Sequence, residues 1–337
     1  MTYAEVLAAA RTCSGPYCKA CPVCNGKACG NAVPGPGAKG SGTAAVRNYE
    51  AWQKLSFNMD TICDNVPVDT SYEFFGETYA IPVFAGPVGA VKLHYGDKYT
   101  DQEYNDILVP GCADAGIAAF TGDGTNPDVF IGAAKAIGAA GGKGIPTVKP
   151  WDLPTVFAKI DAAKAAGAKV FAMDIDAAGL PFLKGLNPPA GPKTVEQLRQ
   201  IIDYAGVPFI IKGVMTVKGA EKALEAGAAG IVVSNHGGRV LDGVPATAEV
   251  LPAIAEAVKG KMTILVDGGI RTGQDVCRAL ALGADAVIMA RPYVTALYGG
   301  QAEGIKVLTD KIKAEMEDTM AMCGVHSLKE ITREMLF

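Results

Sequence analysis

Eight short apolar runs recur along this chain from about residue 80 onward, and segments with helical spacing separate them. The runs are continuous, which is typical of strands buried on both faces of a parallel sheet. They cover residues 81–85, 117–120, 145–148, 170–175, 207–212, 230–234, 263–267 and 286–290. Helices are expected at 194–204, 217–226, 248–258, 272–282 and, as the last long one, 303–322. Eight strand–helix units predict a closed (β/α)₈ barrel, a TIM barrel.

An open, doubly wound α/β sheet is the alternative architecture. The Gly-x-Gly-x-x-Gly fingerprint of its dinucleotide-binding form does not follow any of the eight runs. The first part of the chain differs in composition, because residues 13–42 are crowded with Cys, Gly and Pro. We therefore expect a Cys-rich N-terminal arm over residues 1–46, followed by a barrel over residues 47–337 that begins with a helix at 47–54.

Charge and hydropathy exclude some classes of partner. The 337 residues carry a formal net charge of −4, and no basic stripe with interleaved aromatic residues is present, so we expect no nucleic-acid partner. A run of about eighteen apolar residues is missing, so no membrane span is expected. The first residues lack a secretory signal pattern, which favours a cytoplasmic location. In that compartment nine cysteines favour metal or redox ligation over disulfides.

The stretch Ser234-Asn235-His236-Gly237-Gly238-Arg239 holds the strongest candidates for chemistry. It follows the run at 230–233, so both charged side chains emerge at the carboxyl end of a strand, where barrel enzymes place their active sites. A histidine can move a proton near neutral pH. An arginine can hold a carboxylate through two parallel hydrogen bonds. The alternative is a strand-to-helix loop in which His236 only forms a structural hydrogen bond.

Two further loops suit a phosphate group. Asp267-Gly268-Gly269-Ile270-Arg271 follows the seventh run, and Ala290-Arg291 follows the eighth. The loops after strands seven and eight are the usual phosphate site of this fold. Glycine N–H groups and two guanidinium groups favour a phosphate dianion, although tight turns alone would also use glycines. Lys212 ends the fifth run. A lysine at such a position either extends to solvent or faces an anion, and we expect the anion at this end of a barrel.

The cysteines of the arm have the spacing Cys13-x4-Cys18-x2-Cys21-x2-Cys24-x4-Cys29. Cys-x2-Cys-x2-Cys followed by a fourth cysteine is close to the ligation pattern of ferredoxin-like [4Fe–4S] clusters, in which the last spacing is three. A structural zinc ion is the competing interpretation, and free thiols in a loop are the third. Cys18, Cys21, Cys24 and Cys29 are the candidate metal ligands.

These motifs together resemble the FMN-dependent α-hydroxy-acid oxidase and dehydrogenase family, to which glycolate oxidase and lactate oxidase belong. The resemblance is strong from about residue 205 to 335 and weaker from 47 to 200. It implies a TIM barrel that binds FMN and a small-molecule substrate. His236 would be the acid/base, Arg239 would bind the substrate carboxylate, and Asp176 would orient the histidine. The implied cofactor-binding residues are Pro87, Val88, Gly89, Thr121, Lys149, Asp174, Lys212, Ser234, Asp267, Gly268, Gly269, Arg271, Ala290 and Arg291.

The chain departs from the family pattern on the substrate side. The N-terminal tyrosine that helps bind the carboxylate has no counterpart, and a second arginine is missing from residues 177–182. Trp151 stands in place of a tyrosine and is the expected substrate contact there. Lys149 and Asp174 stand in place of a glutamine and a threonine. One carboxylate anchor therefore remains of three.

The sequence thus predicts an FMN-dependent oxidoreductase acting on a small α-hydroxy acid or a related substrate, with hydride transferred to flavin N5. One rival is an FMN barrel with another reaction, such as an isomerase or reductase. The other is a non-redox phosphate-binding lyase in which Lys212 forms a Schiff base. A homo-oligomer is expected, and an electron-carrier protein is a possible partner.

Overall fold

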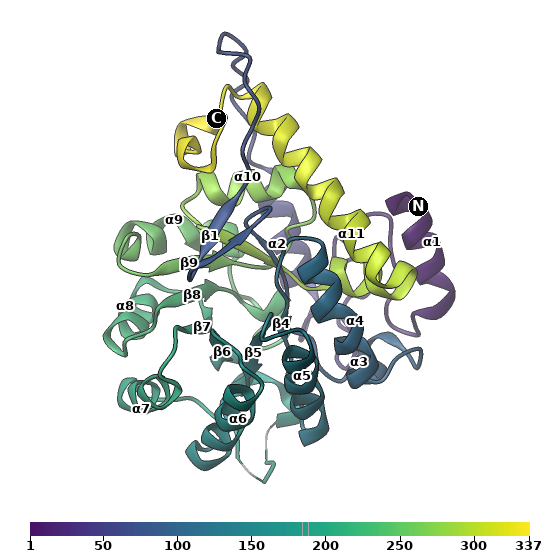
Figure 1. Ribbon diagram of the computed structural model, residues 1–337, viewed down its shortest axis with the longest axis vertical. Helices are drawn as coiled ribbons and strands as arrows, with labels where there is room; N and C mark the ends of the chain where they lie inside the picture. Colours follow the sequence, from purple (N-terminus) through teal and green to yellow (C-terminus); the bar gives the residue numbers. More distant parts are fainter. Residues whose placement is uncertain (184, 188) are drawn as a thin grey trace.

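Eight parallel strands form the centre of the molecule, and the helices surround them (Figure 1). The computed structural model describes residues 1–183, 185–187 and 189–337. The strands are β3 (Val83–Ala85), β4 (Phe120–Thr121), β5 (Ile145–Val148), β6 (Phe171–Asp174), β7 (Phe209–Val214), β8 (Gly230–Val233), β9 (Thr263–Val266) and β10 (Ala286–Met289). Their order is β3-β10-β9-β8-β7-β6-β5-β4. A parallel bridge between Ala85 and Ala119 joins the two outer strands, so the predicted (β/α)₈ barrel is confirmed.

The helices include those predicted at 47–54, 194–204, 217–226, 248–258 and 272–282, with shifts of at most four residues at their ends, and others for which no bounds were predicted. They are α1 (Tyr3–Cys13), α2 (Thr43–Gln53), α3 (Val91–Tyr95), α4 (Asp101–Asp114), α5 (Pro127–Ala139), α6 (Leu153–Ala165), α7 (Val195–Ala205), α8 (Val217–Glu225), α9 (Thr247–Val258), α10 (Gly273–Ala281) and α11 (Arg291–Met322). The last helix begins twelve residues before the predicted start at 303, and its backbone is kinked at Gln301.

Local sequence signals fix several helix ends. The hydroxyl groups of Thr100, Thr194 and Thr272 each accept a hydrogen bond from the backbone of the first helical turn, as a capping box requires. Gly206 ends α7 in the left-handed conformation, which glycine adopts without a steric penalty. These caps fix the residue at which each of these helices begins.

The interior of the barrel is filled by its own side chains and by a hairpin. The strands contribute a buried cluster that includes Phe84, Phe120 and Ile210. The hairpin of β1 (Tyr72–Phe74) and β2 (Glu77–Tyr79) packs Phe74 on this cluster, with ring centroids of Phe74 and Phe84 4.8 Å apart. The sequence did not predict this hairpin, because its three-residue strands are too short for a periodic signal.

The N-terminal arm lies over the carboxyl ends of the strands. After α1, which packs against α11 (Figure 1), residues 14–42 form turns and bends. The N–H of Lys39 donates to the carbonyl of Gly238 at 2.8 Å, and Nε of Arg271 donates to the carbonyl of Cys24 at 2.7 Å. The arm thus contacts the loops that carry the predicted site. A division between arm and barrel at residue 46 stays a prediction.

Among the described residues, no helix combines the length and the apolar character that a membrane span requires.

Candidate active site

A cavity lies at the carboxyl ends of the strands, beneath the arm. All eight barrel strands contribute to its wall, through the loops that follow them or, for β7, through Lys212 near the strand end. The sequence-predicted residues that line it are Pro87, Val88, Gly89, Lys149, Asp174, Lys212, His236, Arg239, Asp267, Gly268, Gly269, Arg271, Ala290 and Arg291. Residues from positions 87 to 291 of the chain therefore converge on one site, as the barrel topology requires.

Four of the predicted residues are placed behind this wall or away from it. Thr121 and Ser234 are fully buried at strand ends, and Asp176 lies behind His236. Trp151 lines a neighbouring cavity instead of the one that contains His236. Its indole N–H donates to Oδ2 of Asp123 at 2.7 Å, which turns the ring away from the predicted substrate contact.

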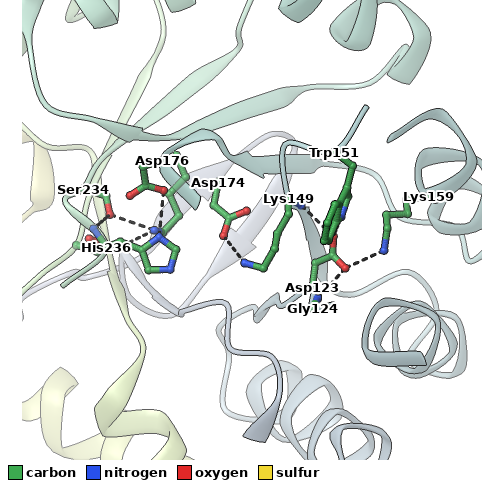
Figure 2. Close-up of polar contacts among 11 residues, drawn as sticks. Asp123, Gly124, Lys149, Trp151, Lys159, Asp174, Asp176, Ser234 and His236 are labelled. Atoms are coloured by element: carbon green, nitrogen blue, oxygen red, sulfur yellow. Dashed lines mark hydrogen bonds and ion pairs between the residues drawn. The ribbon is translucent and has the colours of Figure 1, made fainter. Parts of the chain in front are cut away.

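His236 is held by hydrogen bonds on two sides (Figure 2). It sits in a short 3₁₀ turn after β8, with a positive φ of 57°. Its backbone N–H donates to Oγ of Ser234, and its Nδ1 lies 3.1 Å from Oδ1 of Asp176. A carboxylate can only accept a hydrogen bond, so Nδ1 carries the proton in the neutral ring and Nε2 is left as a base.

The surrounding charges tune this pair. Burial and then the Lys212 cation lower the pKa of His236, and together they outweigh the opposing effect of Asp176. Burial alone would raise the pKa of Asp176, but His236 and Lys212 hold it below its usual value. The histidine is therefore neutral and the aspartate ionised at neutral pH, which is the state of an oriented general base.

Lys212 is a buried cation surrounded by carboxylates. Its Nζ donates to Oγ of Ser234 at 3.1 Å and lies 3.5 Å from Oδ2 of Asp267. Burial alone would lower its pKa, but Asp267, Asp176 and Asp174 together hold it above the usual value. Lys212 thus carries a permanent positive charge at the floor of the cavity.

A second ion pair lies beside the first, formed by Lys149 and Asp174 at 3.1 Å (Figure 2). Both residues occupy positions where the chain departs from the family pattern. Burial raises the pKa of Asp174 despite the nearby Lys149 cation. Oδ1 of Asp174 has no hydrogen-bond partner among the described residues.

Asp123 is the acceptor of several buried hydrogen bonds, and the sequence analysis did not predict it. Its side chain is fully buried and accepts hydrogen bonds from Nζ of Lys159, the indole of Trp151, and the backbone N–H groups of Lys149 and Gly124 (Figure 2). The signal was available, because Thr-Gly-Asp-Gly follows the run at 117–120. Asp123 fixes the loop after β5, and with it Lys149.

The three arginines of the cavity are anchored by backbone carbonyls. Arg239 donates to the carbonyls of Gly35 and Gly37 in the arm, and burial lowers its pKa to about 10. Nε of Arg271 donates to the carbonyl of Cys24, and Arg291 donates to that of Gly237 at 3.4 Å. Each guanidinium keeps further N–H groups for an anion.

His94 also lines the cavity, and its tautomer is the reverse of that of His236. The backbone N–H of Gly35 donates to Nδ1 of His94 at 2.9 Å. Nδ1 is therefore an acceptor, and the neutral ring carries its proton on Nε2. Burial, with help from the Arg239 and Lys149 cations, lowers the pKa of His94 to about 3. His94 is thus a neutral hydrogen-bond donor.

The predicted metal ligands Cys18, Cys21, Cys24 and Cys29 do not form a preformed ion site. Within residues 1–183, 185–187 and 189–337, no three His, Cys, Asp or Glu side chains are grouped so that they could hold a metal ion. The four cysteines instead border a second cavity. Burial, against the opposing effect of a hydrogen bond from the Ala20 backbone, raises the pKa of Cys18 to about 11.

Comparisons with known proteins agree with this geometry. A family model described as FMN-dependent dehydrogenase matches residues 36–182 and 186–337. A peroxisomal (S)-2-hydroxyacid oxidase of Arabidopsis thaliana is 46% identical over 141 residues, which are 42% of this chain and 38% of that protein. An L-lactate dehydrogenase of Ectopseudomonas mendocina is 48% identical over 141 residues, 42% of this chain and 37% of that protein. The matched segment thus spans well under half of these curated relatives.

Solved structures extend the likeness to the whole chain. A Pediococcus acidilactici protein described as a lactate oxidase has a TM-score of 0.82 and 26% identity, with 100% of this chain and 94% of that chain covered. A mandelate oxidase variant with (S)-mandelic acid has a TM-score of 0.80 and 26% identity, with coverage of 100% and 97%. The chain belongs to the FMN-dependent dehydrogenase family.

Proposed function

We propose that this protein oxidises a small 2-hydroxy acid to the 2-oxo acid, with FMN as its cofactor. The observation that carries the proposal is the pair of His236 and Asp176 at a cavity floored by the Lys212 cation. It combines an oriented base with a fixed positive charge in the family's fold. The relatives named as lactate, mandelate and 2-hydroxyacid enzymes supply the substrate class.

The residues present fit FMN. The buried hydroxyl group of Thr147 and one carboxylate oxygen each of Asp174 and Asp267, all residues of the cavity wall, lack partners among the described residues. Buried polar groups are rarely left without a hydrogen bond, and a polar cofactor would supply these bonds. Arg271 and Arg291 offer charged donors for a phosphate group. When bound, FMN supplies an acceptor for the hydride of the substrate.

His236 would remove the proton from the substrate hydroxyl through Nε2. Asp176 would then stabilise the imidazolium that forms, because its carboxylate accepts the hydrogen bond from Nδ1. Lys212 would stabilise negative charge that develops over the floor of the cavity. Positioned acid–base groups of this kind typically contribute about 10²–10⁴-fold in rate.

The substrate carboxylate would contact Arg239 and His94. Arg239 lines the cavity with N–H groups that the arm carbonyls do not use. His94 faces the same cavity with its Nε2–H donor. We propose that His94 supplies part of the carboxylate binding for which the missing tyrosine and second arginine have no counterpart here. Trp151 does not supply it.

Of the rival functions, the Schiff-base lyase fits least. A lysine nucleophile must lose its proton, whereas the carboxylates around Lys212 hold its pKa above the usual value. An FMN enzyme with isomerase or reductase activity would use the same residues, and the substrate test separates it.

The test is the visible spectrum of the purified protein, followed by anaerobic mixing with a panel of 2-hydroxy acids. Flavin absorbance that bleaches with one or more of these acids supports the proposal. A yellow protein that none of them reduces would favour the isomerase or reductase, and a colourless protein that cannot be loaded with FMN would contradict the cofactor assignment.

Three further expectations stay predictions. A homo-oligomer would be seen by sedimentation of the purified protein. A cytoplasmic location would be seen by fractionation of the source cells. An electron-carrier partner would be indicated if the substrate-reduced protein reduces a one-electron acceptor and does not reduce oxygen.

A further inference from the structure

Four cysteines of the arm border one cavity. Cys18, Cys21, Cys24 and Cys29 all lie in its wall, which is completed by Tyr3 and Leu7 of α1 and by residues at the start of α11. None of the four forms a disulfide. The four cysteines that are close in the sequence are therefore also close in space, around one cavity.

The backbone that carries these thiols is hydrogen-bonded to the barrel at Cys24 and to other parts of the arm at Ala20 and Gly30. The carbonyl of Cys24 accepts the bond from Arg271 at 2.7 Å, and the carbonyl of Ala20 accepts one from Nε of Arg11 at 3.0 Å. The N–H of Gly30 bonds to the carbonyl of Gly26 at 3.1 Å. The thiols are thus presented by an anchored loop whose composition gives it little apolar core of its own.

We propose that this cavity binds a [4Fe–4S] cluster through Cys18, Cys21, Cys24 and Cys29. A single zinc ion needs its ligands to converge within about 2.3 Å of one point, and no described group of three such side chains does so. A cluster instead occupies a volume and is bound by thiolates at its corners. Four thiols around a cavity match that requirement.

The charges of the cavity favour the same occupant. Its wall includes the cationic side chains of Lys19, Arg271, Arg291 and Lys311. Among the described residues, no Asp or Glu lines this cavity. Four thiolates around a [4Fe–4S] core leave a net negative charge, which these cations would balance. Hydrogen bonds and nearby charge are the means by which a protein tunes such a cluster.

The cysteine cavity shares part of its wall with the candidate active-site cavity. Pro36, Tyr95, Arg271 and Arg291 line both. The cluster would therefore be a second redox group next to the cofactor site. If the proposed function holds, each 2-hydroxy acid oxidised gives two electrons and two protons. The electrons would leave through the cluster one at a time and reduce two molecules of an oxidised one-electron carrier protein.

The experiment is iron, sulfide and zinc analysis of the full chain prepared without oxygen, with electron paramagnetic resonance after dithionite reduction. The proposal predicts about four irons and four sulfides per chain and a signal of a reduced cluster. Cys21→Ser and Cys24→Ser should each lose most of the iron and the signal. Cys63→Ser, at an exposed cysteine outside the arm, should keep both.

Two readouts keep the outcome separate from the proposed function. Flavin content and circular dichroism report whether a variant folds, and reconstitution of the apoprotein with iron and sulfide tests the site directly. Stoichiometric zinc, or a folded flavoprotein that takes up no iron on reconstitution, would overturn the cluster. Failure of 2-hydroxy acids to reduce the flavin would overturn the proposed function and leave the cluster standing.

Discussion

Nδ1 of His236 lies 3.1 Å from Oδ1 of Asp176, and this contact decides which nitrogen of the ring can act as a base. The same cavity holds His94, whose Nδ1 accepts the N–H of Gly35. One histidine therefore presents an acceptor to the cavity and the other a donor. A hydroxy acid needs both, since its hydroxyl loses a proton while its carboxylate must be bound.

Asp176→Asn should slow flavin reduction by about 10²–10⁴-fold, because the amide can donate to Nδ1 and leave the proton on Nε2. The pH profile should also move. Asp176 raises the pKa of His236 against burial and Lys212, so its loss lowers that pKa and shifts the acid limb of the rate to lower pH. Stopped-flow reduction across a pH series measures both effects. If the pH-independent maximal rate of flavin reduction is unchanged in the variant, Asp176 does not orient the base.

His94→Phe should raise the KM for a 2-hydroxy acid by about 10- to 150-fold, the equivalent of one lost charged hydrogen bond of about 1.5–3 kcal/mol. His94→Gln should retain more affinity, because its amide N–H can take the place of Nε2–H. The rate of flavin reduction at saturation should change much less. If Gln and Phe behave alike, or if only the saturated rate falls, His94 does not bind the carboxylate.

Arg291→Ala and Arg271→Ala should each weaken FMN retention, because each removes a charge-assisted contact on the phosphate side of the cavity. The ratio of flavin to protein after extensive dialysis is the measurement. Arg199→Ala is the matched control, since Arg199 pairs with Glu196 on the exposed face of α7. Full flavin content in both cavity variants would mean that the phosphate binds elsewhere.

Asp123→Ala should lower the free energy of unfolding by about 3–5 kcal/mol, because it leaves Lys159 and several buried N–H groups without their acceptor. Asp310→Ala removes the exposed pair with Lys306 and should cost about 0–1 kcal/mol. Urea unfolding at one fixed flavin saturation compares the two. If both variants lose the same free energy of unfolding, Asp123 does not stabilise its loop in the way proposed.

The sequence was most informative where a pattern is repeated or local. Continuous apolar runs predicted the barrel, and strand ends together with the family resemblance predicted fourteen of the residues that line the cavity. The orientation of Trp151 was not predictable, because it depends on Asp123, 28 positions away. The bonds from Arg239 to the arm join residues more than 200 positions apart. Such contacts depend on tertiary packing, for which a single sequence offers no periodic signal.

The most direct test of the account is anaerobic flavin reduction in His236→Ala compared with the unchanged protein. Both are purified with FMN and mixed with the 2-hydroxy acid that reduces the unchanged protein fastest. The account predicts that His236→Ala keeps its flavin and loses about 10²–10⁴-fold in the rate of bleaching. Bleaching at the unchanged rate would contradict it and leave His236 with a structural role only.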